Sequence, residues 1–201
     1  MPSLASATPS TTYWAPSLGT CQGYLVPHVT YDSYFGKKGA YPADTGLTMG
    51  ISPSSKVQAE IGYDLFMPTS NPVGFYLNGT VCAVAKTFSV GGGVYNAGFR
   101  KNSTNLHTAY LVAQKNLPVG GYVSVGGYYG LGPDALYTNE AGGVKKGGAI
   151  LGWASPDIKV NRKGLSKLLL IADWQTGKNA LGGGGLGLDI YFNDNIGLIK
   201  I

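Results

Sequence analysis

The sequence predicts an all-β fold, and three observations indicate it. Apolar and polar residues alternate strictly from Val57 to Leu65, which is the period of a β-strand with one apolar and one polar face. Similar segments recur along the 201 residues and are separated by Gly, Pro, Asn and Asp. No helical period is long enough to indicate a helix.

Eleven segments carry the strand pattern, and turn residues bound each of them. Most reach the ~9–11 residues that a tilted strand needs to cross a bilayer. In chain order the expected strands are 24–35, 45–52, 56–66, 72–83, 87–99, 105–115, 119–130, 146–155, 166–176, 180–192 and 195–201.

The expected connections alternate in length. Those after odd-numbered strands are mostly longer than those after even-numbered strands, which is typical of an outer-membrane barrel. The longer set is 36–44, 67–71, 100–104 and 131–145, and the shorter set is 53–55, 84–86, 116–118 and 193–194. The connection 156–165 is an exception, because it is long but lies on the side of the tight turns.

The composition favours a membrane protein that crosses with strands. Only 12% of residues are charged, against about 25% in typical soluble domains. No apolar run is long enough for a transmembrane helix. Sparse charge without an apolar run fits a barrel whose apolar surface is dispersed, one residue in two.

The positions of the charges indicate which face is which. All 15 Lys and Arg fall in connections or near strand ends, whereas five of the ten acids fall within strands on the polar phase. A cation at the centre of a lipid face costs roughly 2–4 kcal/mol, so this pattern fits apolar residues facing lipid and polar ones facing inward. A soluble barrel has the opposite arrangement, and the polar phase here is poor in charge for a solvated exterior.

We therefore expect a closed antiparallel up-and-down transmembrane β-barrel of about 10–12 strands. It would occupy residues 21–201 and follow an N-terminal segment, residues 1–20. The candidates for lining the lumen are His28, Asp32, Gln58, Glu60, Asp64, Asn78, Thr80, Asp173, Gln175, Asp189 and Tyr191. The candidates for facing lipid are Val29, Tyr31, Val57, Ile61, Tyr63, Leu65, Leu168, Leu170, Trp174, Leu186, Leu188 and Ile190.

Aromatic residues gather near the expected strand ends. Interface girdles of a membrane barrel would place them there, and ordinary β-propensity explains them equally well. They are Tyr34, Phe35, Phe66, Phe99, Tyr128, Tyr129, Trp153, Trp174, Tyr191 and Phe192.

Four stretches carry a resemblance to a known family. They are Thr12–Pro16, His28–Phe35, Asp44–Leu47 and Ala172–Gly185. With them the chain resembles, along most of its length, a family of uncharacterised bacterial outer-membrane β-barrel proteins. The resemblance implies export and an outer-membrane barrel, and it brings no catalytic residues.

The N-terminal segment and the cysteines bear on export. Residues 5–7, Ala-Ser-Ala, resemble the small-residue end of an export signal, so we expect residues 1–20 to join its remnant to a periplasmic lead-in. Cys21 and Cys82 form either one disulfide in an oxidising compartment or two free thiols.

Several chemistries lack the motif they need. The glycines at 182–185 precede a strand rather than the helix that a phosphate-cradling loop requires. His28 and His107 have no ligand spacing, so we interpret them as interior polar residues. No nucleophile motif stands out, and the basic residues lie in scattered pairs without a nucleic-acid-binding motif. We expect no enzyme activity, metal or cofactor.

The leading functional hypothesis is a narrow, porin-like channel in the bacterial outer membrane. Strand carboxylates would favour cations among small solutes, and the net charge of +5 fits contact with anionic lipid headgroups. Alternatively, strand-end cations such as Lys86, Lys115 and Lys167 neutralise the acids, or the buried carboxylates are protonated. A non-conducting structural or binding barrel that uses its long loops, and a soluble ligand-binding barrel, are the other hypotheses.

Overall fold

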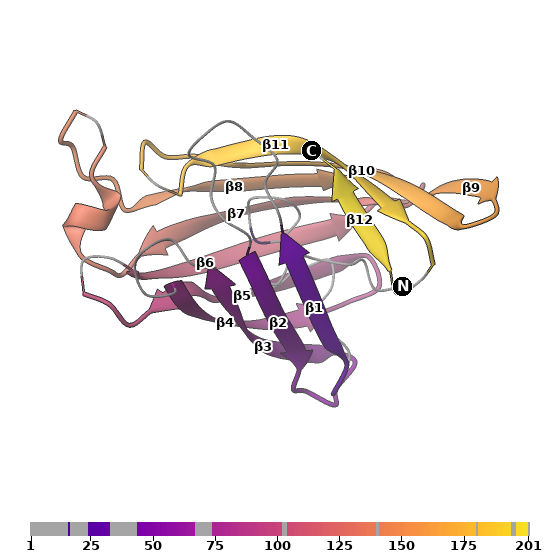
Figure 1. The fold of residues 1–201 in the computed structure, drawn as a ribbon, viewed down its shortest axis with the longest axis horizontal. Coiled ribbons are helices and arrows are strands. Elements are labelled where there is room, and N and C mark those ends of the chain that lie inside the picture. Colours follow the sequence, from indigo (N-terminus) through magenta and orange to yellow (C-terminus); the bar gives the residue numbers. More distant parts are fainter. Residues whose placement is uncertain are drawn as a thin grey trace.

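The computed structural model is a single antiparallel β-sheet with almost no helix (Figure 1). It describes residues 16, 24–32, 44–66, 74–101, 104–139, 141–179, 181–193 and 196–200. No helix in these ranges is long and apolar enough to span a membrane.

The sheet contains twelve strands, and one short 3-10 helix lies in a connection. The strands are β1 Pro27–Asp32, β2 Asp44–Gly50, β3 Val57–Phe66, β4 Gly74–Val84, β5 Phe88–Gly98, β6 Asn105–Asn116, β7 Tyr122–Gly130, β8 Gly147–Ala154, β9 Ile158–Arg162, β10 Leu165–Gln175, β11 Gly183–Tyr191 and β12 Gly197–Lys200. The 3-10 helix, η1, is Asp134–Tyr137.

Eleven of these strands follow one another across the sheet in chain order, and each pairs antiparallel with its neighbours. This confirms the predicted up-and-down order and the eleven predicted strands. The register is continuous in pairs such as β3 with β4, where Val57 faces Ala83 and Phe66 faces Gly74. Bulges interrupt the register of β5 with β4 and with β6. They lie beside Asn96, whose φ of 54° is in the left-handed region.

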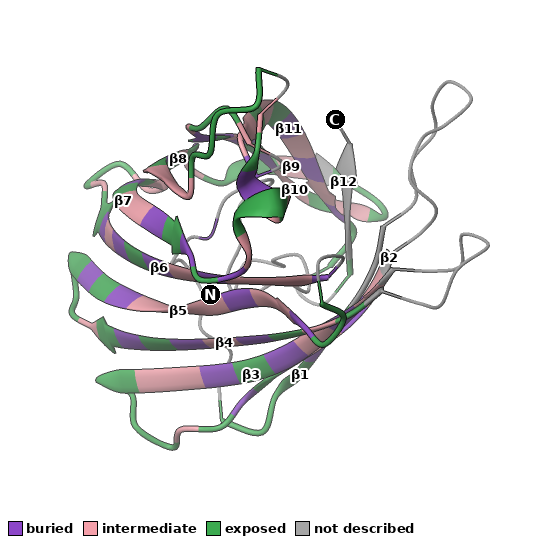
Figure 2. Ribbon diagram, turned by 90° about the vertical axis from the view of Figure 1, so that its left-hand side faces the viewer, coloured by how far each residue is buried: buried purple, intermediate pink, exposed green. Residues whose placement is uncertain are grey.

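The sheet is strongly curved but not closed (Figure 2). Among the described strands, β1 pairs only with β2 and β12 pairs only with β11, so the predicted closed barrel is not observed. The curvature nevertheless brings distant strands face to face. Gln175 Nε2 on β10 donates to the Tyr95 hydroxyl on β5 over 2.7 Å, although β6, β7 and β8 separate these strands within the sheet.

The prediction of a long connection at 156–165 is wrong, because half of that segment, Ile158–Arg162, is strand β9. It pairs with the start of β10, Ile158 facing Leu168 and Arg162 facing Leu165. The turn between them contains Gly164 with φ of 81°. The β9–β10 hairpin therefore extends beyond the turns of the neighbouring strands (Figure 1).

We call the concave side, toward which Tyr95 and Gln175 point, the inner face, and the opposite side the outer face. Two clusters of buried apolar side chains lie on the inner face. The larger joins Tyr95, Tyr110, Tyr128 and Tyr137 to Cys82, Val112, Ile150 and Leu181, and the smaller contains Ala154, Leu169, Ile171 and Tyr191. Aromatic and aliphatic side chains thus fill much of the inner face.

Candidate functional site: the polar inner face

Four predicted acids lie on the inner face of the sheet. Glu60, Asp64, Asp173 and Asp189 are between 1% and 6% exposed, although they come from three strands, β3, β10 and β11. Figure 2 shows why, because buried and exposed residues alternate along β3 and β4. The period of the strand turns each acid inward and its apolar neighbours outward.

Most other residues predicted to line a lumen are also buried. Those buried are His28, Asn78, Thr80, Gln175 and Tyr191, and Gln58 is half-buried. The side chain of Asp32 lies outside the described residues.

None of the residues predicted to face lipid is buried where the structure describes its side chain. Val29, Val57, Ile61, Leu170, Trp174 and Leu186 are exposed, and Tyr63, Leu65, Leu168, Leu188 and Ile190 are half-buried. The side chain of Tyr31 lies outside the described residues. The apolar phase therefore forms the outer face and the polar phase the inner face.

A hydrogen-bonded chain of polar groups joins β3 to the bulge of β5. Asn78 Nδ2 donates to Asp64 Oδ2 over 2.6 Å. The backbone N–H of Asn96 donates to Asn78 Oδ1 over 3.0 Å. Asn78 thus supports an inner carboxylate with one end of its amide and a left-handed backbone position with the other.

Tyrosines fill the middle of the inner face, and the sequence reasoning missed them. The rings of Tyr95 and Tyr110 meet edge to face with centroids 5.7 Å apart. The Tyr110 hydroxyl hydrogen-bonds Thr80, and Tyr95 accepts from Gln175. For Tyr110 the available signal was that it shares a phase of β6 with Thr108 and Gln114, but apolar Val112 lies on the same phase and weakens the pattern.

Two of the aromatic residues near strand ends, for which an interface girdle was one explanation, point inward, and one of them, Tyr191, was also predicted to line the lumen. Tyr128 and Tyr191 are buried, because each falls on the inner phase of its strand. The Tyr128 hydroxyl donates to the carbonyl of Thr176 over 2.7 Å and lies 3.1 Å from Nδ2 of Asn179, so it ties β7 to the β10–β11 connection.

Cations and acids separate in space. Among described side chains no Lys or Arg is buried, whereas four of the six acids are. Lys86 and Lys115 are exposed, and Lys167 pairs with Asp157 over 3.0 Å and lies 4.7 Å from the Tyr191 ring centroid. Electrostatic attraction from Lys167 also reaches Asp189, which favours neutralisation of this acid by a strand-end cation.

Exposed aromatic side chains of the described strands lie at strand ends on the outer face. The exposed set is Phe75, Phe88, Phe99, Tyr129, Trp153, Trp174 and Phe192, each in the first two or last two positions of a strand or directly after it. Tyr63, Phe75 and Phe99 stack in a row, with centroids 5.5 Å and 6.3 Å apart. Aliphatic residues such as Ile61, Leu111 and Val125 occupy the middle.

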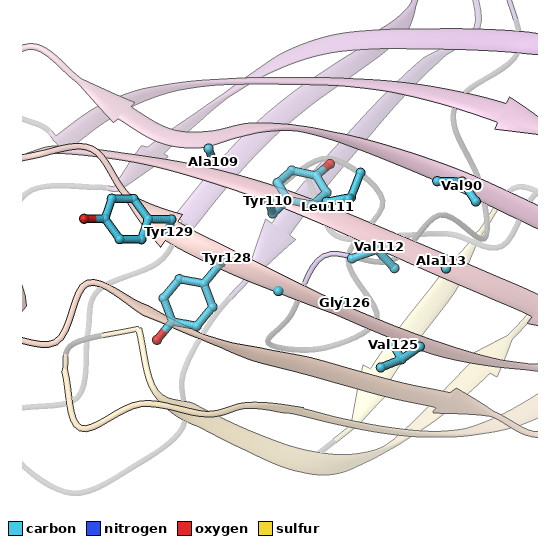
Figure 3. A pocket seen from close by; sticks show the side chains of 11 residues that line it. Val90, Ala109, Tyr110, Leu111, Val112, Ala113, Val125, Gly126, Tyr128 and Tyr129 are labelled. Carbon is cyan, nitrogen blue, oxygen red and sulfur yellow. The ribbon is translucent and has the colours of Figure 1, made fainter.

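A shallow groove of about 640 Å³ lies over β6 and β7 (Figure 3). Exposed Leu111, Val125 and Tyr129 stand beside small residues such as Ala109 and Gly127. No residue of its lining carries a charge or an aliphatic hydroxyl. The groove can therefore accept hydrocarbon but offers no catalytic group.

Cys82 is buried on the inner face of β4 and is disulfide-bonded. Cys21, the only other cysteine of the sequence, lies outside the described residues. The alternative of a free thiol at Cys82 is thereby excluded.

Within the described ranges, no three His, Cys, Asp or Glu side chains gather to hold a metal ion. Comparison with protein-family models, curated proteins and solved structures finds no match. The resemblance to outer-membrane barrels therefore stays a prediction, and functional inference rests on the two faces of the sheet.

Proposed function

We propose that the chain is a β-barrel of the bacterial outer membrane whose outer face contacts lipid and whose acidic interior passes small cations. The observation that carries the proposal is the polarity of the faces, since carboxylates lie inside and large apolar side chains outside. Soluble monomers rarely expose apolar patches larger than a few hundred Å². In lipid the same surface needs no other cover.

The positions of the exposed aromatic side chains support insertion of the strands across the bilayer. Tyr and Trp favour the interface between hydrocarbon and headgroups, and the exposed rings lie at both ends of strands whose middles are aliphatic. Cations beyond the strand ends, such as Arg100, Lys145 and Lys163, are placed to meet anionic headgroups.

Closure of the barrel is part of the proposal. Backbone N–H and C=O groups of β1 and β12 have no sheet partner on one side among the described strands. Each unsatisfied group in hydrocarbon costs several kcal/mol, so an open edge is not viable there. Pairing of β12 with β1 would remove both edges.

The cation preference follows from the charges on the inner face. The described inner face buries four acids and no Lys or Arg, so acidic groups outnumber cations there. Rings of carboxylates favour cations over anions.

Planar-bilayer recording tests this function. The purified protein should give small conductance steps, with a reversal potential that favours K⁺ over Cl⁻. Replacing the interior acids with E60Q, D64N, D173N and D189N should abolish the preference, whereas D134N, at an exposed loop acid, should not. A preference for anions would reject the proposed passage of cations. A cation preference that the four substitutions leave unchanged would also reject it.

A non-conducting structural or binding barrel is the second candidate, and the packing of the inner face favours it. Thr108, Val112, Ile150 and Gln175 are at most 1% exposed, and the bond from Gln175 to Tyr95 bridges opposite walls. Absence of conductance together with stable insertion into vesicles would select this candidate. Recovery of folded protein without detergent would instead select a soluble ligand-binding barrel.

A further inference from the structure

The connection between β7 and β8 folds toward the inner face. The structure describes its residues 131–139 and 141–146. Leu131 N donates to the carbonyl of His107 and Gly132 N to that of Leu106, which ties the connection to β6. Figure 2, seen from the end where η1 lies, shows this short coil in front of the curve of the sheet.

Tyr137, at the end of η1, is the side chain that enters the interior. It is 0% exposed and belongs to the inner cluster of Tyr95, Tyr110 and Tyr128. Its hydroxyl donates to the carbonyl of Leu106 and lies 3.5 Å from the Thr108 hydroxyl. A loop tyrosine therefore occupies space between the strands, where an open barrel would hold water.

The neighbouring backbone is shaped to admit this ring. A Cβ at Gly130 would overlap the ring of Tyr137. A Cβ at Gly132 would overlap the carbonyl of Asn105, so glycine also allows the connection to pass close to β6. A side chain at either position would push the connection outward.

Lys146 holds the connection in this position. Its Nζ lies 2.6 Å from Asp134 Oδ1, donates to the carbonyl of Gly132 over 2.9 Å and lies 5.9 Å from the Tyr137 ring centroid. The hydrogen bond to Asp134 raises the pKa of Lys146, so the ammonium stays charged. One side chain thus joins the start of η1, its end and the first strand after it.

We propose that the β7–β8 connection narrows the long-loop end of the interior and that Tyr137 sets the width of that end. The inference rests on the proposed function where it concerns ions. The occlusion itself is a statement about access to the inner face, and it can be tested without conductance.

Access to Thr108 gives the first test. T108C places a thiol beneath the Tyr137 hydroxyl, and the structure holds no free cysteine. In lipid vesicles, a cationic methanethiosulfonate reagent should modify T108C/Y137A at least about tenfold faster than T108C, since opening of the site is no longer required. T108C/Y137F, which keeps the ring, should stay slow.

A matched control is Y129A, because Tyr129 is the exposed tyrosine of β7 and points outward. T108C/Y129A should react at the rate of T108C. Far-UV circular dichroism of each variant shows whether the sheet is intact. Equal rates for T108C and T108C/Y137A in folded protein would overturn the inference, as would T108C/Y137F reacting as fast as T108C/Y137A.

Conductance gives the second test and separates the two proposals. Y137A should conduct more than the wild type, whereas Y129A should not. Fast modification of T108C/Y137A without any conductance would keep the occlusion and reject the ion passage. Wild-type conductance unchanged in Y137A would reject Tyr137 as the residue that sets the width.

Discussion

Trp174 and Gln175 are neighbours on β10, yet Trp174 is 61% exposed and Gln175 is 1% exposed. A soluble protein of this sequence would present the amide to water and cover the indole. The inverted order recurs on β3, where exposed Ile61 lies beside buried Glu60. The outer face therefore suits hydrocarbon, whereas the inner face suits polar contacts.

An arginine in the middle of the outer face should destabilise the protein more than any other substitution considered. Leu111 is 64% exposed on β6. If lipid covers it, L111R should lower the free energy of unfolding by about 2–4 kcal/mol, whereas an exposed aqueous site would change by about 0.5 kcal/mol or less. Denaturant titration of vesicle-embedded protein, followed by tryptophan fluorescence, measures the difference.

K115R is the matched control for that substitution, since Lys115 is an exposed cation near the end of the same strand. It should leave the free energy of unfolding unchanged. A similarly small effect of L111R would mean that water, not lipid, covers the outer face.

The neighbours Cys82 and Val81 lie on opposite faces of β4, and only Cys82 forms a covalent cross-link. C82S removes a disulfide on the inner face and should destabilise the protein by about 2–4 kcal/mol. V81A, on the exposed phase, should cost less. Reductant should destabilise the wild type and leave C82S unaffected, as measured by denaturant titration, and an unaffected wild type would contradict the prediction.

The bond between Tyr95 and Gln175 tests whether opposite walls meet. Q175A should cost about 1–3 kcal/mol, because a buried tyrosine hydroxyl loses its partner. Y95F should lessen the effect of Q175A, so a double-mutant cycle should give a coupling of about 0.5–1.5 kcal/mol. Additive effects in the cycle would show that the walls do not meet there.

Sequence periodicity predicted the eleven strands and the inward phase of Glu60, Asp64 and Asp173, because a strand period of two fixes which residues share a face. It could not predict Tyr137, since an inward loop has no period. Strand β9 was not predicted, because Pro156 and several charged residues made the segment resemble a loop. The Lys163-Gly164 pair indicated the turn that follows this strand.

Closure of the sheet also lies beyond sequence periodicity. Alternation specifies the faces of each strand but not which edges pair. The inner face was hard to predict on β8 and β10 for a related reason. Ile150, Leu169 and Ile171 are buried there, so the inward phase is partly apolar and the contrast between phases is weak.

Neighbouring residues also differ in the β7–β8 connection, where Lys145 and Lys146 have different surroundings. Lys145 is exposed, whereas Lys146 turns toward Asp134 and the Tyr137 ring. Because Asp134 is exposed, water screens the pair, and D134N should lower the free energy of unfolding only slightly, and less at high salt. K145A should have no effect. In T108C protein, D134N should nevertheless speed thiol modification, since weakening one contact of Lys146 frees the connection that carries Tyr137; an unchanged rate would mean that the ring stays inside without this ion pair.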